Sequence, residues 1–275
     1  MKLKSIISLL IAGSLCGCSD YLDVVPDNIA TIDMAFNNKV NAEKYLATCY
    51  SYVPLYGALR DNPGLTAGND VWFYTMEDQY FDNKWSFGIA NGLQNVNDPL
   101  NNYWDGGYGG KALYQAIRDC NIFIENVSDR SRVVDLEETE RRRWLAEIKV
   151  MKAYYHFYLL QLYGPIPIVD ENLPISTPAD EVRVMRDKVE KVVDYIVNLI
   201  DESVGDLPLK INSEATELGR LTQPAALAIK AKTLLLAASP LFNGNTDYAN
   251  FKDWDGEPYF PQTYDINKWK LAADA

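Results

Sequence analysis

Apolar residues recur every three to four positions over several stretches of the chain, which is the spacing of one face of an α-helix. Stripes of this kind predict three helices in the first two thirds of the sequence, over 42–53, 110–127 and 135–163. Pro54 ends the first of these helices because proline has no backbone N–H to donate. Asp135 and Glu138 form an approximate capping box at the start of the third, and Gly164 ends it.

Three further helices are predicted towards the C-terminus, over 178–202, from Thr222 to about 238, and over 266–272. Thr222 is the expected N-cap of the second of these, with Pro224 in its first turn. Short connections between successive helices favour antiparallel pairs. The pattern therefore predicts a mostly α, α-solenoid-like body, although no clean 34-residue sequence repeat is present.

The stretch from Tyr56 to Tyr103 lacks this periodicity and is predicted to be a long non-helical loop. It is rich in Asn, Gly, Asp and aromatic residues, and Asp98-Pro99 is one of its turn signals. Long loops in compact domains are usually functional. The aromatic content of the whole chain is 12 %, and we expect part of this ring surface to serve a ligand.

Residues 1–17 have the pattern of an export signal, with Lys2 and Lys4 before a short apolar run. Ile6 to Leu15 is too short to span a bilayer, and the small Gly17 precedes Cys18. This ending resembles a bacterial lipobox, which implies cleavage before Cys18 and lipid attachment to its thiol. An ordinary secretory signal with an incidental cysteine is the alternative.

The chain is acidic, with 38 Asp and Glu residues against 26 Lys and Arg residues and a formal net charge of −12. Removal of 1–17 takes away two lysines and no acid, so the remaining chain is more negative still. Nucleic acid is therefore an unexpected partner. The one basic run, Arg141-Arg142-Arg143, is flanked by glutamates and is predicted to be a solvated helix face.

Histidine-dependent chemistry is excluded because His156 is the only histidine and is expected to be a hydrogen-bonded core residue. No metal site or cofactor is predicted. Cys49 and Cys120 fall within predicted helices, where buried free thiols and a disulfide are both open. Glu77 and Asp78 could in principle form the carboxylate pair of a glycosidase, but binding without catalysis is the favoured interpretation.

Several blocks of the sequence resemble the SusD/RagB family of outer-membrane lipoproteins. Residues 146–159 (AEIKVMKAYYHFYL) with 162–167 (LYGPIP) are similar to its signature helix and the exit from that helix. Residues 219–243, from GRLT through AALAIKAK to AASPLFN, are similar to a second family block. Trp104, Tyr108 and Asn121 have the spacing of a third block, and the start at Cys18 also agrees.

The resemblance implies a mostly helical fold of tetratricopeptide-like pairs, with a second half rich in loops. It also implies a surface-exposed, lipid-anchored protein of the outer membrane that passes oligosaccharide to a SusC-type TonB-dependent transporter. Peptide binding, as in some family members, and a helical interaction scaffold without a small ligand are the alternatives. Family members are about twice as long, so we expect that residues 18–275 correspond to the helical domain and that the C-terminal half is missing.

The family carries ligand contacts in the loop that precedes the Trp104 block. Sugar binding needs flat rings for the apolar face of the pyranose and polar groups for its hydroxyls. We expect stacking on Trp72, Tyr74 and Trp85, and hydroxyl contacts with Asp70 and Asn91. The alternative is that these rings only anchor the loop, which is the role predicted for Trp104 and Tyr108.

Overall fold

The computed structural model of the protein describes residues 32–54 and 84–275. Within these ranges the chain forms helices and isolated β-bridges but no strand, which confirms the mostly α prediction. The helices are α2 (Ile32–Ala35), α3 (Lys39–Ser51), α5 (Lys84–Ala90), α6 (Leu113–Ser128), α7 (Glu138–Tyr163), α8 (Val189–Ser203), η3 (Val204–Asp206), α9 (Glu214–Glu217), α10 (Gln223–Ala238), η4 (Thr246–Tyr248) and α11 (Asn267–Asp274).

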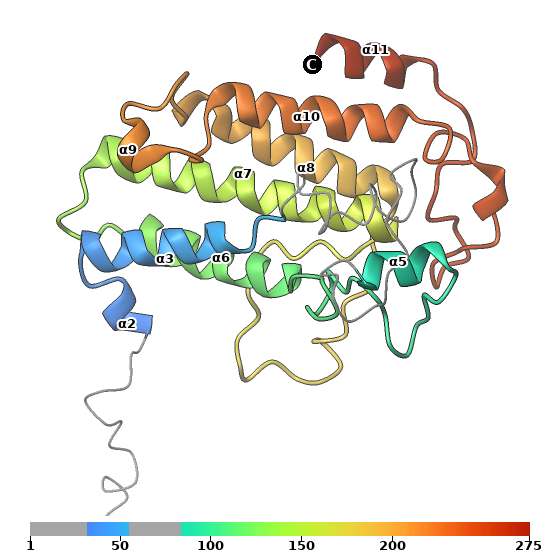
Figure 1. The fold of residues 1–275 in the computed structure, drawn as a ribbon, viewed down its shortest axis with the longest axis horizontal. Helices are drawn as coiled ribbons and strands as arrows, with labels where there is room; N and C mark the ends of the chain where they lie inside the picture. Colours follow the sequence, from blue (N-terminus) through green and yellow to red (C-terminus); the bar gives the residue numbers. More distant parts are fainter. Residues whose placement is uncertain (1–31, 55–83) are drawn as a thin grey trace, which may run out of the picture.

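The long helices run back and forth as antiparallel neighbours, with α7 at the centre (Figure 1). Helix α7 packs against α6 on one side and α8 on the other, and α3 covers α6 and α7. Helix α10 packs on α8, and α11 packs on α10. The pairs α3/α6, α7/α8 and α10/α11 are therefore stacked in the manner expected of a helical solenoid.

One continuous core holds the helices together, and aromatic side chains supply its largest members. Trp144, Tyr155 and Phe123 are fully buried between α6 and α7. Phe36, from the link between α2 and α3, packs its ring 5.9 Å from that of Phe123. The Tyr155 hydroxyl donates to the Cys49 carbonyl oxygen, so the α3–α7 contact also satisfies a buried phenol.

Helix α8 begins at Val189, eleven residues later than the predicted start at 178. The apolar residues of 178–188 are exposed, with Val182 at 51 % and Val184 at 55 %, so this segment does not bury a helical face. The segment is held instead by hydrogen bonds to the exit of α7. Arg186 donates to the Pro165 carbonyl oxygen, and the Asp187 carboxylate accepts from the Ile168 N–H at 2.9 Å.

The predicted capping box of α7 is wrong, because α7 is preceded by Glu137 without a side-chain cap. Asp135 caps a different helix, accepting a hydrogen bond from the Lys39 N–H at the start of α3 at 2.8 Å. Thr222 does precede α10 as predicted, although its hydroxyl makes no cap hydrogen bond. Helix α5 is an addition, since it lies in the stretch predicted to be non-helical.

The basic run is not a solvated face. Arg141 is 4 % exposed and donates to the carbonyl oxygens of Val127 and Val133, which closes the α6–α7 connection. Arg143 is half-buried in an ion network, and only Arg142 is exposed. Among the residues that the structure describes, no helix combines the length and the apolar character needed to cross a bilayer.

Candidate functional site

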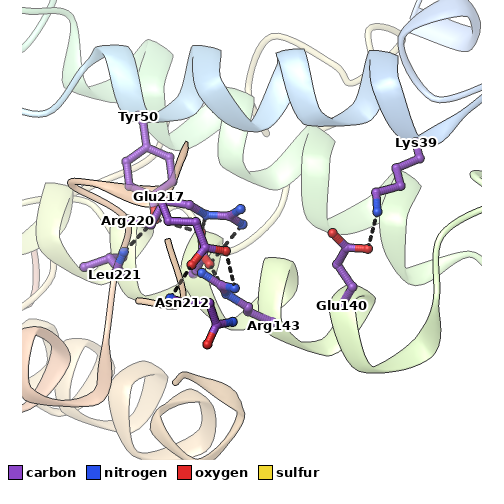
Figure 2. Close-up of polar contacts among 9 residues, drawn as sticks. Lys39, Tyr50, Glu140, Arg143, Asn212, Glu217, Arg220 and Leu221 are labelled. Carbon is purple, nitrogen blue, oxygen red and sulfur yellow. Dashed lines mark hydrogen bonds and ion pairs between the residues drawn. The ribbon is translucent and has the colours of Figure 1, made fainter. Parts of the chain in front are cut away.

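A buried carboxylate, Glu147, lies at the centre of a polar network where α3, α7 and the segment before α10 meet. Figure 2 shows the side chains around it, among them Tyr50, Arg143, Glu217 and Arg220. Its Oε1 accepts from Arg143 Nε at 2.9 Å, and its Oε2 accepts from the Tyr50 hydroxyl at 2.8 Å. Arg220 Nε donates to Oε2 at 3.1 Å, and Arg220 Nη2 lies 3.0 Å from Oε1. The negative charge of Glu147 is therefore balanced by two guanidinium groups inside the protein.

The network extends to the backbone of the neighbouring segment. Arg143 Nη1 donates to Glu217 at 2.8 Å, and Glu217 in turn accepts from the Asn212 N–H at 2.8 Å. The hydrogen bond from Arg143 lowers the pKa of Glu217. The Tyr50 hydroxyl accepts from the Leu221 N–H at 3.0 Å, and burial raises the pKa of Tyr50 far above its ordinary value. These contacts fix residues 212–221 against α3 and α7.

A cavity of about 600 Å³ lies beside this network, and we call it the α3–α7 cavity. Its lining residues come from α3, α7, α10 and the fixed segment, and they are Glu43, Leu46, Ala47, Tyr50, Val53, Met151, Tyr154, Thr216, Leu218, Gly219, Arg220, Leu221 and Ile229. The walls are mainly apolar, with two tyrosine rings and Glu43 and Arg220 as charged groups. This composition suits a ligand with an apolar body and few polar groups.

A second candidate surface is a pair of aromatic rings near α5. Trp85, in the first turn of α5, is half-buried, and its ring lies 4.8 Å from that of Tyr108 with the planes at 70°. Tyr108 is 44 % exposed. Its hydroxyl is hydrogen-bonded to Asp98, which raises the pKa of Tyr108. The pair presents exposed ring surface beside a carboxylate, which is the combination that sugar recognition requires.

Glycine at position 109 permits this ring pair. Gly109 has φ +90°, and a Cβ there would lie 2.9 Å from Trp85 Cδ1 and 2.6 Å from Asn101 Oδ1. The neighbouring backbone forms a tight turn in which the Asn101 N–H donates to the Tyr108 carbonyl oxygen at 2.9 Å. Asn101 Nδ2 also donates to Ser86 on α5 at 2.7 Å. The turn and α5 are therefore joined, and Trp85 lies directly against the backbone of the turn.

Three of the predicted ligand residues, Asp70, Trp72 and Tyr74, lie outside the described residues. The same is true of the predicted lipidation site and of the acidic pair that would serve a glycosidase. Trp85 is brought together with Tyr108, as described above. Asn91 is exposed and follows the last turn of α5, so the length of this helix separates it from Trp85.

The packing role predicted for Trp104 is confirmed, and that for Tyr108 is incomplete. The Trp104 ring contacts the ring of Tyr163 at 5.4 Å, and the Arg186 guanidinium lies over it at 5.2 Å. Tyr108 packs on Trp85 but remains exposed. Its φ of +47° shows that the turn, and not a helix, directs its side chain. The preceding glycine run, 106–107, is the sequence signal for this geometry.

His156 is a fully buried, hydrogen-bonded core residue, as predicted. The Val169 N–H donates to Nε2 at 3.4 Å, so Nδ1 carries the proton and donates to the Lys152 carbonyl oxygen at 2.8 Å. Burial lowers the pKa of His156 to about 4. Cys49 and Cys120 are both buried free thiols, and they are close enough to interact.

The site residues that the sequence did not reveal are those of the Glu147 network. Glu147 and Arg143 lie on a helix with regular charge spacing, where surface ion pairs are the ordinary interpretation. Arg220 is 73 positions away from Glu147, so no local pattern connects them. Over 32–54 and 84–275, the structure contains no cluster of three or more His, Cys, Asp or Glu side chains suited to a metal ion.

Comparison with known proteins shows a consistent likeness. Residues 20–235 match the profile of the SusD-like family described as starch-binding and associating with the outer membrane. A SusD-like protein of Bacteroides ovatus is 26 % identical over 258 residues, which cover 90 % of this chain and 41 % of that protein.

Solved structures agree with this likeness. The structure named BT4246 has a TM-score of 0.71 at 28 % identity, covering 86 % of this chain and 38 % of the other. A laminarin binding SusD-like protein has a TM-score of 0.55 at 21 % identity, covering 77 % of this chain and 45 % of the other, and shows the fold alone. The chain thus spans less than half the length of each of these three relatives.

Proposed function

We propose, because the chain belongs to the SusD-like family of starch-binding proteins that associate with the outer membrane, that it binds oligosaccharide at the cell surface without altering it. The family match over 20–235 is the observation that carries this proposal. The laminarin binding SusD-like protein has the same fold, which supports a glycan ligand for this chain. In this proposal the protein captures the ligand and delivers it to a SusC-type TonB-dependent transporter.

The proposed glycan site is the aromatic region around α5. Trp85 and the exposed Tyr108 supply ring surface, and Asp98 adds a carboxylate beside it. We propose that Trp72 and Tyr74 add stacking rings and that Asp70 and Asn91 hydrogen-bond sugar hydroxyls. Burying the apolar face of a pyranose on a ring removes both surfaces from water, while the carboxylate and amide oxygens accept from hydroxyls.

Titration of the protein with a panel of oligosaccharides, including laminarin fragments, tests this site by isothermal calorimetry. Trp85→Ala should weaken binding about fivefold, because a stacked ring pair contributes roughly 1 kcal/mol. Trp254→Ala is the matched control, since Trp254 is 82 % exposed and lies far along the chain from α5. Equal affinity of both variants and the parent protein would show that Trp85 is not part of the site.

Peptide binding is the second candidate function, and the α3–α7 cavity favours it. Its apolar walls and its two tyrosine rings suit an apolar side chain of a peptide better than a hydroxyl-rich sugar. Adding apolar peptides to the calorimetric panel separates the two functions. A protein that binds peptides through Tyr154 and no glycan would support this second function over the first.

The proposed anchoring and partnership are tested in cells. Cys18 is the proposed lipid attachment site, so Cys18→Ala should abolish incorporation of labelled palmitate and release the protein from membranes. The transporter partner should co-purify with the parent protein from solubilised outer membranes. Lipid labelling that persists in Cys18→Ala would place the attachment elsewhere.

A further inference from the structure

The α3–α7 cavity has an apolar floor and an open rim, and the two differ in chemistry. Its floor is formed by Leu46 and Met151, which are 3 % and 1 % exposed. The lining residues that are exposed lie where the cavity opens to solvent, and they are Glu43, Ala47, Thr216, Leu218 and Gly219. Glu43 is the charged member of this rim. An apolar floor with one charged group at the rim suits a ligand that has an apolar body and one charged end.

The wall that α3 contributes gives the cavity a direction. Glu43, Leu46, Ala47 and Tyr50 follow each other at a spacing of three or four residues, so they share one face of α3. From Glu43 to Tyr50 this face extends about 10 Å along the helix axis. An extended peptide covers that length with about three residues. A short peptide with its charged end at Glu43 can therefore lie along this wall towards the Tyr50 ring.

The uncompensated charge at the cavity is negative. Arg220, the other charged lining residue, is neutralised by the buried Glu147, to which its Nε donates at 3.1 Å. Among the residues that the structure describes, the Glu43 carboxylate forms neither a hydrogen bond nor an ion pair. Lys39, one turn earlier on α3, is paired with Glu140 instead. The charge that complements this cavity is therefore a cation placed beside Glu43.

The short distance between charge and floor selects the kind of cation. Glu43 and Leu46 are neighbours on the same face of α3, so a ligand must carry its positive charge close to its apolar group. In the first residue of a peptide, the α-amino group and the side chain are attached to the same Cα atom. The ammonium group of a lysine side chain, in contrast, lies at the end of a four-carbon stem.

We propose that the α3–α7 cavity binds the free amino terminus of a short peptide that begins with apolar residues. The α-amino group pairs with the Glu43 carboxylate, and the first side chains cover the floor formed by Leu46 and Met151. This inference rests on peptide binding, the second candidate function, and specifies which end of the peptide enters the cavity.

Calorimetric titration of the whole chain with Leu-Phe-Ala amide and with its N-acetyl derivative tests the proposal. The two probes differ in the charge of the amino terminus, and both lack a terminal carboxylate that the acidic chain would repel. At pH 6.5 the free amine is protonated, and it should bind about fivefold more tightly, as expected for a partly exposed ion pair. The difference should shrink as salt is added and as the pH rises above about 8, where the amine loses its proton.

Glu43→Gln should weaken binding of the free peptide about fivefold and leave the acetylated peptide unchanged. The four affinities form a thermodynamic cycle that isolates the pair between amine and carboxylate. Glu43 is exposed, so an unchanged circular-dichroism spectrum should confirm that the variant folds. Glu125→Gln is the matched control, since it removes an exposed carboxylate from α6 that does not line this cavity.

Ala47→Leu tests the cavity itself, separately from its charge. Ala47 is an exposed rim residue of α3, and leucine is a good helix former, so the helix should be retained. The larger side chain occupies space between Glu43 and Tyr50. Both peptides should therefore bind about tenfold more weakly to this variant.

Four results would overturn the proposal: equal affinity of the parent protein for both peptides, an equal loss for both in Glu43→Gln, the same loss in Glu125→Gln, or unchanged binding to Ala47→Leu. Equal affinity for the two peptides together with a loss in Ala47→Leu would remove the role of the amino terminus and leave peptide binding in the cavity intact. Absence of binding by either peptide would overturn both this inference and the second candidate function.

Discussion

At the scale of single residues, the contribution of an ion pair to stability depends on how deeply its charges are buried. Glu147 is fully buried and is held by two arginines and a tyrosine hydroxyl. Glu140, seven residues earlier on the same helix, pairs with Lys39 at the surface, where both side chains are about one third exposed. Figure 2 shows the Lys39–Glu140 pair standing apart from the network around Arg143 and Arg220. The two carboxylates are a natural comparison of a buried and an exposed ion pair.

Replacing the carboxylate of Glu147 should be far more harmful than replacing that of Glu140. Glu147→Gln leaves Arg220 without its carboxylate partner and leaves Arg143 with Glu217 alone, and we expect a loss of roughly 3 kcal/mol in the free energy of unfolding. Glu140→Gln should cost less than about 1 kcal/mol. Urea denaturation followed by circular dichroism measures both. Similar losses in the two variants would contradict the assigned burial.

His156 should make stability depend on pH in the mildly acidic range. Its pKa is about 4 in the folded protein, against an ordinary value of 6.5, so the unfolded chain binds more protons between these values. The stability contributed by neutral His156 is complete above pH 6.5 and is lost as the pH falls towards 4. The slope is up to about 1.4 kcal/mol per pH unit.

The measurement is the free energy of unfolding between pH 4.5 and 7 for the parent protein and for His156→Gln. Carboxylates also titrate near the lower end of this range, but they are shared by both proteins. The difference between the two curves therefore isolates the histidine. A variant with the same slope as the parent protein would show that His156 is not buried in its neutral form.

The two interior thiols give a direct test of redox state. Cys49 and Cys120 are both buried, and burial raises the pKa of Cys120 well above its ordinary value. A buried neutral thiol is a poor nucleophile. In the variant Cys16→Ala/Cys18→Ala, where Cys49 and Cys120 are the cysteines that remain, we expect no reaction with Ellman's reagent in the native protein and reaction of both thiols after denaturation without reductant. Absence of these thiols after denaturation would indicate that they form a disulfide.

At the scale of elements, the sequence was most informative where a helix buries one face. It was least informative where side chains form hydrogen bonds with backbone atoms that are distant in the sequence. The stripes of α3, α6, α7 and α8 were recognised because they fill the core. Residues 178–188 were predicted to be helical, but Arg186 and Asp187 hold this segment against the exit of α7 instead. Asp135 likewise caps α3, almost a hundred residues away. No local pattern encodes such contacts.

The turn next to α5 provides a prediction at this scale. Gly107 and Gly109 both have positive φ, but a Cβ would meet Trp85 and Asn101 only at Gly109 and nothing within 4 Å at Gly107. Alanine at either position bears the cost of the strained backbone, roughly 1–2 kcal/mol. Only Gly109→Ala should also displace the Trp85 ring.

Fluorine NMR of the protein labelled with fluorotryptophan measures this displacement. The resonance of Trp85, assigned by its loss in Trp85→Ala, should move in Gly109→Ala and stay in place in Gly107→Ala. Glycan binding should weaken in the first variant and not in the second if α5 carries the proposed site. Equal shifts in both variants would mean that backbone strain alone, and not the close approach at Gly109, sets the position of the ring.

At the scale of the whole molecule, the candidate sites differ in how far the sequence revealed them. The family, the helical pairs and the role of Trp85 as an aromatic surface residue follow from local motifs. The α3–α7 cavity arises only where helices from separate pairs meet, so it depends on packing that no single motif specifies. Tyr108 shows the same limit, because its exposure depends on a turn made by its glycine neighbours.

The stacked arrangement also predicts a gradient of local stability along the solenoid. Helix α7 is packed between α6 and α8 and has most of its side chains buried, whereas α11 has none buried, packs mainly on α10 and adds one ion pair to α8, between Lys268 and Glu190. Amides in the centre of α7 should exchange only by global unfolding, and those of α11 should exchange by local opening with a much smaller free energy. Hydrogen exchange detected by mass spectrometry measures both.

Adding urea at low concentration should accelerate exchange in α7 and leave α11 almost unchanged, because only global unfolding exposes much new surface to the denaturant. Equal protection of the two helices would show that α11 opens only together with the core.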